Sequence, residues 1–518
     1  MSIFNRVPLH PLLFSAYPIL ALLAHNLDQI KPAAAWRLLL FIVVGIIVLY
    51  LLLVLVFRNR HMVAVICTLF AILFFSYGHV YEYLNQLNMP LAAIARHRYL
   101  LPIWLAISVI GLWLIGRNRR QIHSTTPMLN AMGVIAITLP LIQILFFQIQ
   151  TQQALKEKLE SNNHLSSITD FEVETQPDIY YIILDAYTRQ DILEENYCLD
   201  NTSFISSLRD MGFYVADCSQ SNYAQTELSM AATFNMDYLE NLGDSFTAGN
   251  NDRSGLWPLL RHGKVRQMLE SVGYNVIAFE TGYYWIQWED ADSYLSLPKS
   301  ASISSLFREG GLNSFEAMLI RTSVFRVILD TNAVTDFLDS LLPDLEYHEK
   351  VVRERTLFVL DRLQPDNVPA IKGPKFIYAH IIAPHPPYVF GPKGEFAEHG
   401  EEFTYNDQIT YINKRILQVV DGIIENSQSQ PIIIIQGDHG LKDTPNERVA
   451  ILNAYYLPEG GVENLYPSIS PVNSFRLVFD HYLGTEFGLL DDISYYSTYE
   501  LPYNYEIVPN FCRTELSK

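Results

Sequence analysis

The chain has 518 residues, 49% of them hydrophobic, and a formal net charge of −19. This length exceeds that of a typical single domain, so more than one domain is expected. The acidic balance excludes nucleic acids as expected partners, because a polyanion would be repelled.

The charge is divided unevenly along the chain. Residues 1–150 contain 10 basic and 2 acidic residues, for a net charge of +8. The remainder contains 26 basic and 53 acidic residues, for a net charge of −27. We therefore expect the two parts to lie in different surroundings.

The first part has the composition of membrane-spanning helices. Each of its apolar stretches approaches the roughly 20 residues needed to cross a bilayer. Pro18 interrupts the first stretch, but a cleaved signal peptide is rejected because further stretches follow and no clear cleavage site is present. We predict a transmembrane domain of about five helices over residues 1–150, with spans near 8–25, 36–57, 62–82, 99–116 and 127–149.

Basic residues near these spans give an orientation. With the N-terminus in the cytoplasm, six Lys or Arg residues lie in cytoplasmic segments and four lie in outer loops. The sequences RNR and RNRR occupy the two shortest loops, both on the cytoplasmic side of this arrangement. An odd number of spans then places residues 150–518 outside the cytoplasm.

The cysteines outside the first part leave two alternatives open. Cys198, Cys218 and Cys512 all follow the last span. A bridge between Cys198 and Cys218 is compatible with an oxidising compartment. Free buried thiols are the alternative.

The second part reads as an α/β domain. Residues 151–177 are polar, include a short helical pattern, and are expected to form a juxtamembrane linker. Beyond them, strands alternate with helices, which indicates a doubly wound, mainly parallel sheet covered on both faces over residues 178–518. The strands are expected at 178–187, 213–217, 275–281, 375–388 and 431–440, and the main helices at 201–211, 265–272 and 405–427.

Metal-ligand residue types follow three of these strands. Asp185 ends the first, His380 and His385 belong to the fourth, and Asp438-His439 ends the last. Ligands bind beyond the carboxyl ends of strands in open α/β sheets, and buried charged groups need a partner. The pattern predicts a site for a divalent metal ion, and it does not choose among Mn²⁺, Mg²⁺ and Zn²⁺.

Each of these residues also has a structural interpretation. Asp185 could cap the following turn, and Asp438-His439 could form a hydrogen-bonded turn. His380 has apolar neighbours, which favours an ordinary core histidine. His385 lies among three prolines, where either a structural turn or rigid presentation of an imidazole is consistent with the sequence.

Thr226 is the candidate nucleophile. It follows a loop and opens a helical pattern in NYAQTELSMA. Free N–H groups and the helix dipole at such a position favour an anion. A simple N-cap is the equally concrete alternative.

Two further segments carry open alternatives. In GYYWIQWEDADSY (282–294), Trp285 and Trp288 could stack on a substrate, form an interfacial belt, or belong to the core. Arg448 could clamp a phosphate bidentately or pair with an acid such as Glu447. The structural role is favoured for Arg448.

The ordered set YYIILDAY, NYAQTELSMA, AHIIAPHPPY and IIIIQGDHG resembles the alkaline phosphatase/sulfatase superfamily over residues 175–485. With its apolar first part, the chain is similar to membrane-anchored members such as lipoteichoic acid synthases and phosphoethanolamine transferases. The resemblance implies an alkaline phosphatase-like catalytic domain. It also implies that Asp185, Asp438 and His439 are metal ligands, that Thr226 is both ligand and nucleophile, and that His385 binds the anion or protonates the leaving group.

Two departures narrow what the resemblance implies. Sulfatases of this superfamily carry Cys/Ser-x-Pro-x-Arg at the nucleophile, whereas this chain has TELSM, without the Pro and Arg. Classical sulfatase chemistry, in which this residue is oxidised to formylglycine, is therefore not expected. A full second set of metal ligands is also not recognisable, so a one-metal site is expected.

The resulting expectation is a multi-pass protein of a bacterial cytoplasmic membrane with an extracytoplasmic catalytic domain. It would transfer a phosphoglycerol- or phosphoethanolamine-type headgroup through a phospho-Thr intermediate, using a phospholipid or envelope glycan as substrate. A phosphate or sulfate ester hydrolase of the same fold and a non-catalytic envelope scaffold are the alternatives. The sequence leaves the oligomeric state open.

Overall fold

The computed structural model divides the chain into two compact units. One contains Met1–Ile149 and Ser300–His348, and the other contains Gln150–Lys299 and Glu349–Lys518. The structure describes residues 7–27, 32–86, 96–119, 121–161, 176–297, 314–329, 347–369, 371–396 and 402–512.

Long apolar helices build the first unit. Among the described residues, four stretches are long and apolar enough to cross a membrane: Pro32–Phe57, Arg60–Asn85, His97–Arg117 and Ile122–Gln153. Helix α2 has 16 residues, fewer than the roughly 20 that span the hydrocarbon core, so the fifth span remains a prediction. The helices are α2 (His10–His25), α3 (Trp36–Phe57), α4 (Arg60–Gln86), α5 (His97–Arg117) and α6 (Ile122–Ser161).

These helices expose many apolar side chains, and contact of so much apolar surface with water would be unfavourable. On α3, for example, Leu55 and Val56 are 75% and 71% exposed. Large exposed apolar surfaces mark contact with a membrane or with another protein. The composition of α3, without a charge from Leu38 to Phe57, favours lipid as the surrounding medium.

Two short helices that follow the fourth strand in the sequence belong to the first unit. Helix α14 (Ser314–Thr322) contacts α2 and α4, and α15 (Arg326–Leu329) follows it. Arg37 Nε donates to Glu316 Oε1 at 2.7 Å, and Arg326 Nη1 donates to Glu82 Oε1 at 2.7 Å. A Cβ at Gly78 would lie 2.2 Å from the Arg321 carbonyl oxygen, so this close approach requires glycine.

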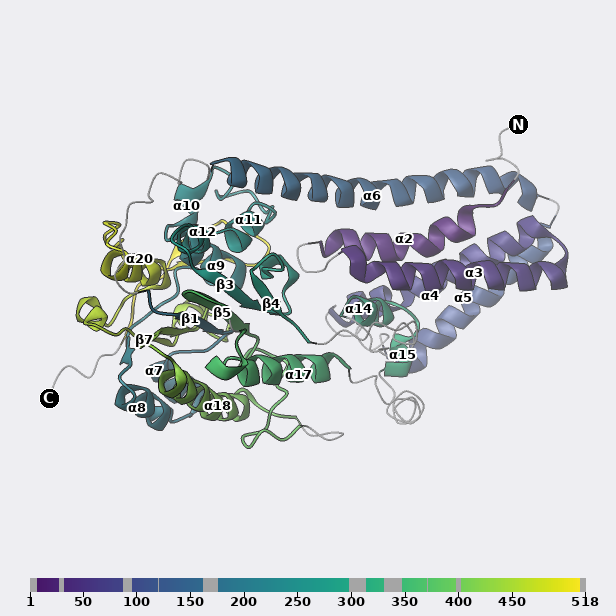
Figure 1. Ribbon diagram of the computed structural model, residues 1–518. Coiled ribbons are helices and arrows are strands. Elements are labelled where there is room, and N and C mark those ends of the chain that lie inside the picture. The colour runs from purple at the N-terminus through teal and green to yellow at the C-terminus, as the bar shows by residue number, and fades with distance from the viewer. Residues whose placement is uncertain are drawn as a thin grey trace. The chain divides into compact units, whose positions relative to one another are not determined.

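The second unit is organised by a seven-stranded sheet of order β2-β7-β6-β1-β5-β3-β4 (Figure 1). Strands β6, β1, β5, β3 and β4 are parallel, and β7 is antiparallel to both of its neighbours. The strands are β1 (Ile179–Leu184), β2 (Tyr214–Val215), β3 (Asn275–Phe279), β4 (Ser293–Leu295), β5 (Lys375–Ile381), β6 (Ile432–Gln436) and β7 (Asn453–Tyr456).

Helices cover both faces of this sheet (Figure 1), so the second unit is an α/β domain with a mixed sheet, in which β7 is antiparallel to both neighbours while the other pairs are parallel. Every residue of β1 and β6 is buried, which explains their unbroken apolar sequences. One face carries α7 (Gln190–Tyr197), α8 (Thr202–Asp210), α17 (Tyr347–Arg362) and α18 (Tyr405–Asn426), and the other carries α9 (Thr226–Asn235), α11 (Leu256–Arg261), α12 (Lys264–Ser271) and α20 (Pro471–Tyr482).

The disulfide differs from the pairing considered above. Cys218 is bonded to Cys512, 294 residues away, whereas Cys198 is free and exposed. The C-terminal segment returns to the loop before α9, where the Asn510 side chain donates to the Cys218 carbonyl oxygen at 2.7 Å. A bridge between Cys198 and Cys218 is therefore wrong, because the chain brings a distant cysteine to this loop.

Removing this disulfide is expected to destabilise the second unit. The double variant Cys218→Ser/Cys512→Ser should lose about 2–4 kcal/mol of unfolding free energy, and Cys198→Ser should lose little because its thiol is exposed. Denaturant unfolding of the purified chain measures both. Non-reducing peptide mapping that finds Cys198 in a disulfide would contradict the pairing.

Candidate active site

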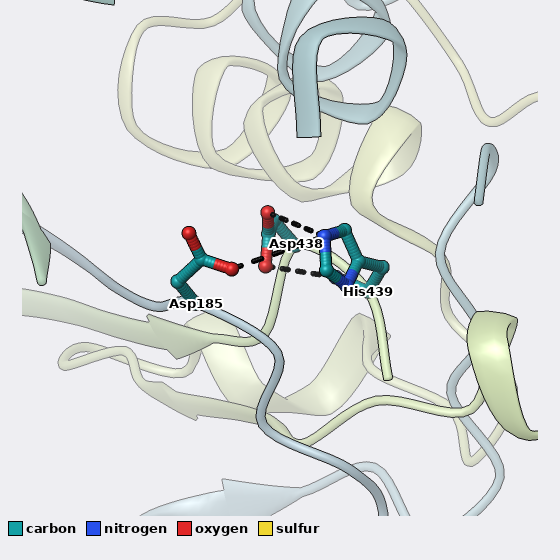
Figure 2. Close-up of side chains that lie close together, drawn as sticks. All are labelled: Asp185, Asp438 and His439. Atoms are coloured by element: carbon teal, nitrogen blue, oxygen red, sulfur yellow. Dashed lines mark hydrogen bonds and ion pairs between the residues drawn. The ribbon is translucent and has the colours of Figure 1, made fainter. Parts of the chain in front are cut away.

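The neighbouring central strands β1 and β6 bring three of the predicted residues to one edge of the sheet. Asp185 follows β1, and Asp438 and His439 follow β6, which pairs with β1. These three side chains converge (Figure 2), and one ligand atom of each lies within 4.8 Å of the others. All three residues are buried. The convergence predicted from the strand ends is thus present in the structure.

Asp438 is held by backbone N–H groups through one oxygen. Its Oδ1 accepts from Ala186 N at 3.0 Å and from its neighbour His439 N at 2.9 Å. Ala186 has φ +59°, a left-handed conformation that costs an L-residue about 1–2 kcal/mol. Tyr405 also fixes Ala186, by donating to its carbonyl oxygen at 2.6 Å. Asp438 Oδ2 is left facing the cluster, 3.5 Å from His439 Nε2.

The tautomer of His439 follows from its other ring nitrogen. Nδ1 lies 2.9 Å from the Gly440 carbonyl oxygen, which can only accept, so Nδ1 carries the hydrogen. Nε2 therefore presents a lone pair. Burial, followed by the charge of Arg448, lowers the pKa of His439 to about 4. The imidazole is neutral near pH 7, which is the form that binds a metal.

Gly440 lets the strand-to-loop connection take this path. A Cβ at this position would lie 2.0 Å from the Glu447 carbonyl oxygen. Because that neighbour is backbone, it cannot move aside as a flexible side chain could. The second glycine of GDHG is therefore required by close backbone approach, and it keeps the Gly440 carbonyl within reach of His439.

Thr226 is the first residue of α9, and its hydroxyl reaches the same imidazole. Thr226 Oγ1 lies 3.0 Å from His439 Nε2. Because Nε2 has no hydrogen, the threonine hydroxyl is the donor. The N-cap position belongs to Gln225, so the alternative that Thr226 is a simple N-cap is wrong. Unlike the buried carboxylates, Thr226 is only half-buried.

A buried ion pair anchors the start of α9. Arg253 Nη1 lies 2.6 Å from Glu227 Oε2, and both side chains are buried. Arg253 also donates to Gln225 Oε1 at 2.5 Å and to the Tyr499 carbonyl oxygen at 2.9 Å. These contacts fix the residues on either side of Thr226 against the C-terminal segment.

His380 is buried, as the interpretation of a core histidine requires, but it also faces the cluster. Its Nε2 lies 3.6 Å from Asp185 Oδ2 and has no hydrogen-bond partner among the described residues. His385 is half-buried, and its backbone N–H donates to the Asp185 carbonyl oxygen at 3.0 Å. Burial raises the pKa of Asp185, but His385 and His380 outweigh it and hold that pKa below its usual range.

In the aromatic segment 282–294, the residue beside the cluster is Tyr283, and neither of the two tryptophans considered from the sequence takes that place. Trp288 is fully buried and donates from Nε1 to the Leu260 carbonyl oxygen at 2.9 Å. Trp285 is buried and stacks on Tyr283, with ring centroids 5.0 Å apart. Tyr283 is the ring beside the cluster, 6.0 Å from His380 between centroids. Burial, with the charges of Asp185 and Asp438, raises the pKa of Tyr283 well above its usual value.

Arg448 also lies closer to the cluster than its sequence position suggested. Its Nη2 lies 3.2 Å from His439 Nε2. It does not pair with Glu447, whose Oε2 accepts from the Thr444 hydroxyl at 2.9 Å. The sequence offered Arg448 as a possible phosphate ligand but favoured a structural role, and it did not single out Tyr283.

Unpartnered buried atoms test whether the residues fit a metal ion. Both oxygens of Asp185, Asp438 Oδ2 and His380 Nε2 have no hydrogen-bond partner in the described part of the chain. Each such atom costs about 1–3 kcal/mol, and carboxylates this close also repel each other. A divalent cation would satisfy them, and oxygen donors with one imidazole suit Mn²⁺, Mg²⁺ or Zn²⁺. The residues therefore fit a metal ion.

A protein-family model described as Sulfatase matches residues 177–468, more than half of the chain. This interval contains Asp185, Thr226, His385, Asp438 and His439. No curated protein matches the chain.

Solved structures of phosphoethanolamine transferases give distant matches. Two are C-terminal periplasmic domains: EcEptC from Escherichia coli in complex with Zn (10% identity, TM-score 0.35, 61% of this chain and 85% of that one) and EptC from Campylobacter jejuni (10% identity, TM-score 0.36, 61% and 92%). The integral membrane protein EptA from Neisseria meningitidis covers more of the chain (12% identity, TM-score 0.33, 91% and 93%). Similarity this distant does not assign an activity.

Proposed function

Because the chain belongs to the sulfatase family, we propose that it is a membrane-bound, metal-dependent enzyme that transfers a phosphorylated headgroup of phosphoglycerol or phosphoethanolamine type. The transfer proceeds through a phosphothreonine at Thr226. One observation carries this proposal: the Thr226 hydroxyl, at the start of α9, lies 3.0 Å from His439 Nε2 beside three buried carboxylate oxygens, both of Asp185 and Oδ2 of Asp438, that have no hydrogen-bond partner in the described part of the chain. TELSM lacks the Pro and Arg of the sulfatase nucleophile motif, so a phosphate ester is the proposed substrate.

Asp185, Asp438, His439 and Thr226 are the residues that would hold the metal ion. When bound, a divalent cation supplies positive charge that lowers the pKa of a coordinated hydroxyl and stabilises phosphoryl oxygens. The N–H groups in the first turn of α9 point in the same direction as its dipole and favour the same anion. Backbone contacts of Asp438 and His439 hold their ligand atoms without help from the substrate.

The proposed reaction has two displacements. The Thr226 hydroxyl first loses its proton to solvent. Its deprotonated Oγ1 then forms a bond to phosphorus while the bond from phosphorus to the lipid oxygen breaks, and His385 gives that leaving oxygen a proton. An acceptor hydroxyl then attacks the phosphorus on Thr226, gives its proton to His385, and releases Thr226 Oγ1 in its deprotonated form. His385 Nδ1 donates to the Pro386 carbonyl oxygen at 2.6 Å, which leaves Nε2 as the nitrogen that exchanges the proton.

Two observations support an extracytoplasmic reaction at a membrane. In the described part of the chain, four helices that are long and apolar enough to cross a membrane precede the sheet of the second unit, and they would keep the site near lipid substrates. The Cys218–Cys512 disulfide lies in the second unit, and disulfides persist in oxidising compartments outside the cytoplasm. The cytoplasmic membrane of a bacterium, with the second unit on its outer side, is the proposed location.

Lipid turnover tests the function. The detergent-purified full chain, loaded with Mn²⁺ or Zn²⁺, is mixed with vesicles of phosphatidylglycerol and phosphatidylethanolamine, with and without an envelope glycan. We expect metal-dependent release of diacylglycerol from one lipid and the matching headgroup on the glycan. Free phosphorylated headgroup without any transfer would instead establish a hydrolase. A metal-loaded protein that consumes neither lipid would contradict the proposal.

A further inference from the structure

The guanidinium of Arg448 joins two loops of the site. Arg448 lies in α19 (Pro445–Val449) and is half-buried. Its Nε donates to the Ala224 carbonyl oxygen at 2.7 Å, and its Nη1 donates to the carbonyl oxygens of Gly440 and Leu441 at 3.2 and 3.1 Å. Ala224 lies two residues before Thr226, and Gly440 follows His439. The three carbonyl contacts fix the guanidinium plane against both loops.

This plane places the remaining nitrogen beside the imidazole nitrogen that the Thr226 hydroxyl also contacts. Arg448 Nη2 lies 3.2 Å from His439 Nε2, and Thr226 Oγ1 lies 3.0 Å from the same nitrogen. The guanidinium and the hydroxyl therefore both donate toward one atom. An oxygen attached to a phosphorus on Thr226 Oγ1 would lie near this position.

One lone pair cannot serve three partners. His439 Nε2 accepts in the plane of the ring from a single direction, and a coordinated cation would occupy that direction. Arg448 Nη2 would then need another acceptor, because an arginine keeps its charge and its hydrogens at all ordinary pH values. A phosphoryl oxygen is the strongest acceptor that the proposed reaction brings to this place.

The formal charges at the site also favour a second, permanent cation. Asp185 and Asp438 together carry two negative charges that a divalent ion would neutralise, so these three groups leave no net positive charge to balance an incoming phosphate. Lys442 is exposed and lies 3.5 Å from Glu447, so it is already paired away from the cluster. Arg448, in contrast, is close to the cluster: its Nη2 lies 3.2 Å from His439 Nε2.

We propose that Arg448 binds the phosphoryl group on Thr226 through Nη2, while its other nitrogens hold the Thr226 loop against the metal-binding loop. This inference rests on the proposed function and adds to it a phosphate-binding residue. It implies that a tetrahedral oxyanion binds only once the metal has taken His439 Nε2. It also implies that Arg448 and the metal act together on anion affinity.

Binding of inorganic phosphate to the full chain in detergent tests this inference without turnover. Titration calorimetry is carried out on wild type, Arg448→Gln and Arg448→Lys, with and without Zn²⁺, and elemental analysis measures the bound metal. We expect Arg448→Gln to weaken phosphate binding by about 10- to 100-fold when metal is bound. Metal content should be retained, and Arg448→Lys should recover part of the affinity. Without metal, the same substitution should change the weak binding by less than about 3-fold.

Arg476 provides a matched control for loss of loop contacts. It is also half-buried, and its three donors go to backbone carbonyl oxygens of Gly488, Met236 and Phe487 at 2.7, 2.8 and 2.5 Å. Met236 follows the far end of α9. Arg476→Gln should therefore lower the unfolding temperature as Arg448→Gln does, and leave phosphate affinity within about 2-fold of wild type.

Three results would overturn the inference. One is wild-type phosphate affinity in metal-loaded Arg448→Gln, and another is an equal loss of affinity in Arg476→Gln. The third is a metal-loaded wild type that binds no phosphate. The proposed function is tested by separate measurements. Diacylglycerol release and a phosphorylated Thr226 can both be observed whether or not phosphate binding depends on Arg448.

Discussion

Thr226→Val is expected to lower headgroup transfer by a factor on the order of 1000 or more, with little change in thermal unfolding. Valine keeps the shape of threonine but removes the oxygen that would bond to phosphorus. The hydroxyl makes a hydrogen bond only to His439 among its described neighbours, so the fold depends little on it. Diacylglycerol release from vesicles measures the activity.

Two controls make the Thr226 result specific. Thr226→Ser keeps a hydroxyl and should retain measurable transfer. Thr233→Val, in the same helix, loses the bond from its hydroxyl to the Ser229 carbonyl oxygen and should keep activity near wild type. Full activity in Thr226→Val would show that the acceptor or water attacks the lipid directly.

Asp438→Asn is expected to weaken divalent cation binding by at least about 100-fold. The amide oxygen of asparagine can keep the two N–H contacts that Oδ1 now accepts, from Ala186 and His439. At the position of Oδ2, however, an NH₂ group would direct hydrogens at the cation. The negative charge would be lost as well. Elemental analysis after dialysis measures bound Mn²⁺ and Zn²⁺.

Thermal unfolding gives a second measure of the same change. Metal at 100 times its dissociation constant stabilises the wild type by about 2.7 kcal/mol, and Asp438→Asn should show none of this gain at the same concentration. Asp443→Asn is the matched control, because its carboxylate is exposed and accepts from Tyr496 at 3.1 Å. Equal metal content in Asp438→Asn and wild type would contradict the metal site.

The central strands were predictable because burial on both faces leaves a strong signal. β1 and β6 are wholly apolar apart from Gln436 at the end of β6, and neither interrupts its run with a turn residue. β7 has four residues and lies antiparallel to β6. Nothing in so short a segment encodes its direction, which is set by the hydrogen bonds it forms with β6.

The site was partly predictable for a related reason. Parallel strands place their carboxyl ends together, so Asp185 and Asp438 could be expected at one edge before any coordinates were known. His380 lies inside β5, where apolar neighbours hide its contact with Asp185. The position of Arg448 depends on three backbone carbonyl groups in two separate loops, and a single sequence carries no pattern for such contacts.

Long-range contacts account for the other differences. The Cys218–Cys512 bond joins residues 294 positions apart, and the sequence does not indicate a pairing over such a distance. The place of α14 in the first unit depends on partners far away in the sequence, such as Arg37 for Glu316. In both cases the information lies in the partner rather than in the local sequence.

The most direct test is mass spectrometry of the peptide that contains Thr226, after incubation of the full chain with Mn²⁺ and a phospholipid extract. The proposal predicts a headgroup phosphate on Thr226 that requires the metal and is absent from Thr226→Val and Asp438→Asn. The mass of the adduct would name the donor headgroup. Release of diacylglycerol by a metal-loaded protein, with Thr226 unmodified under rapid quenching, would contradict the covalent intermediate.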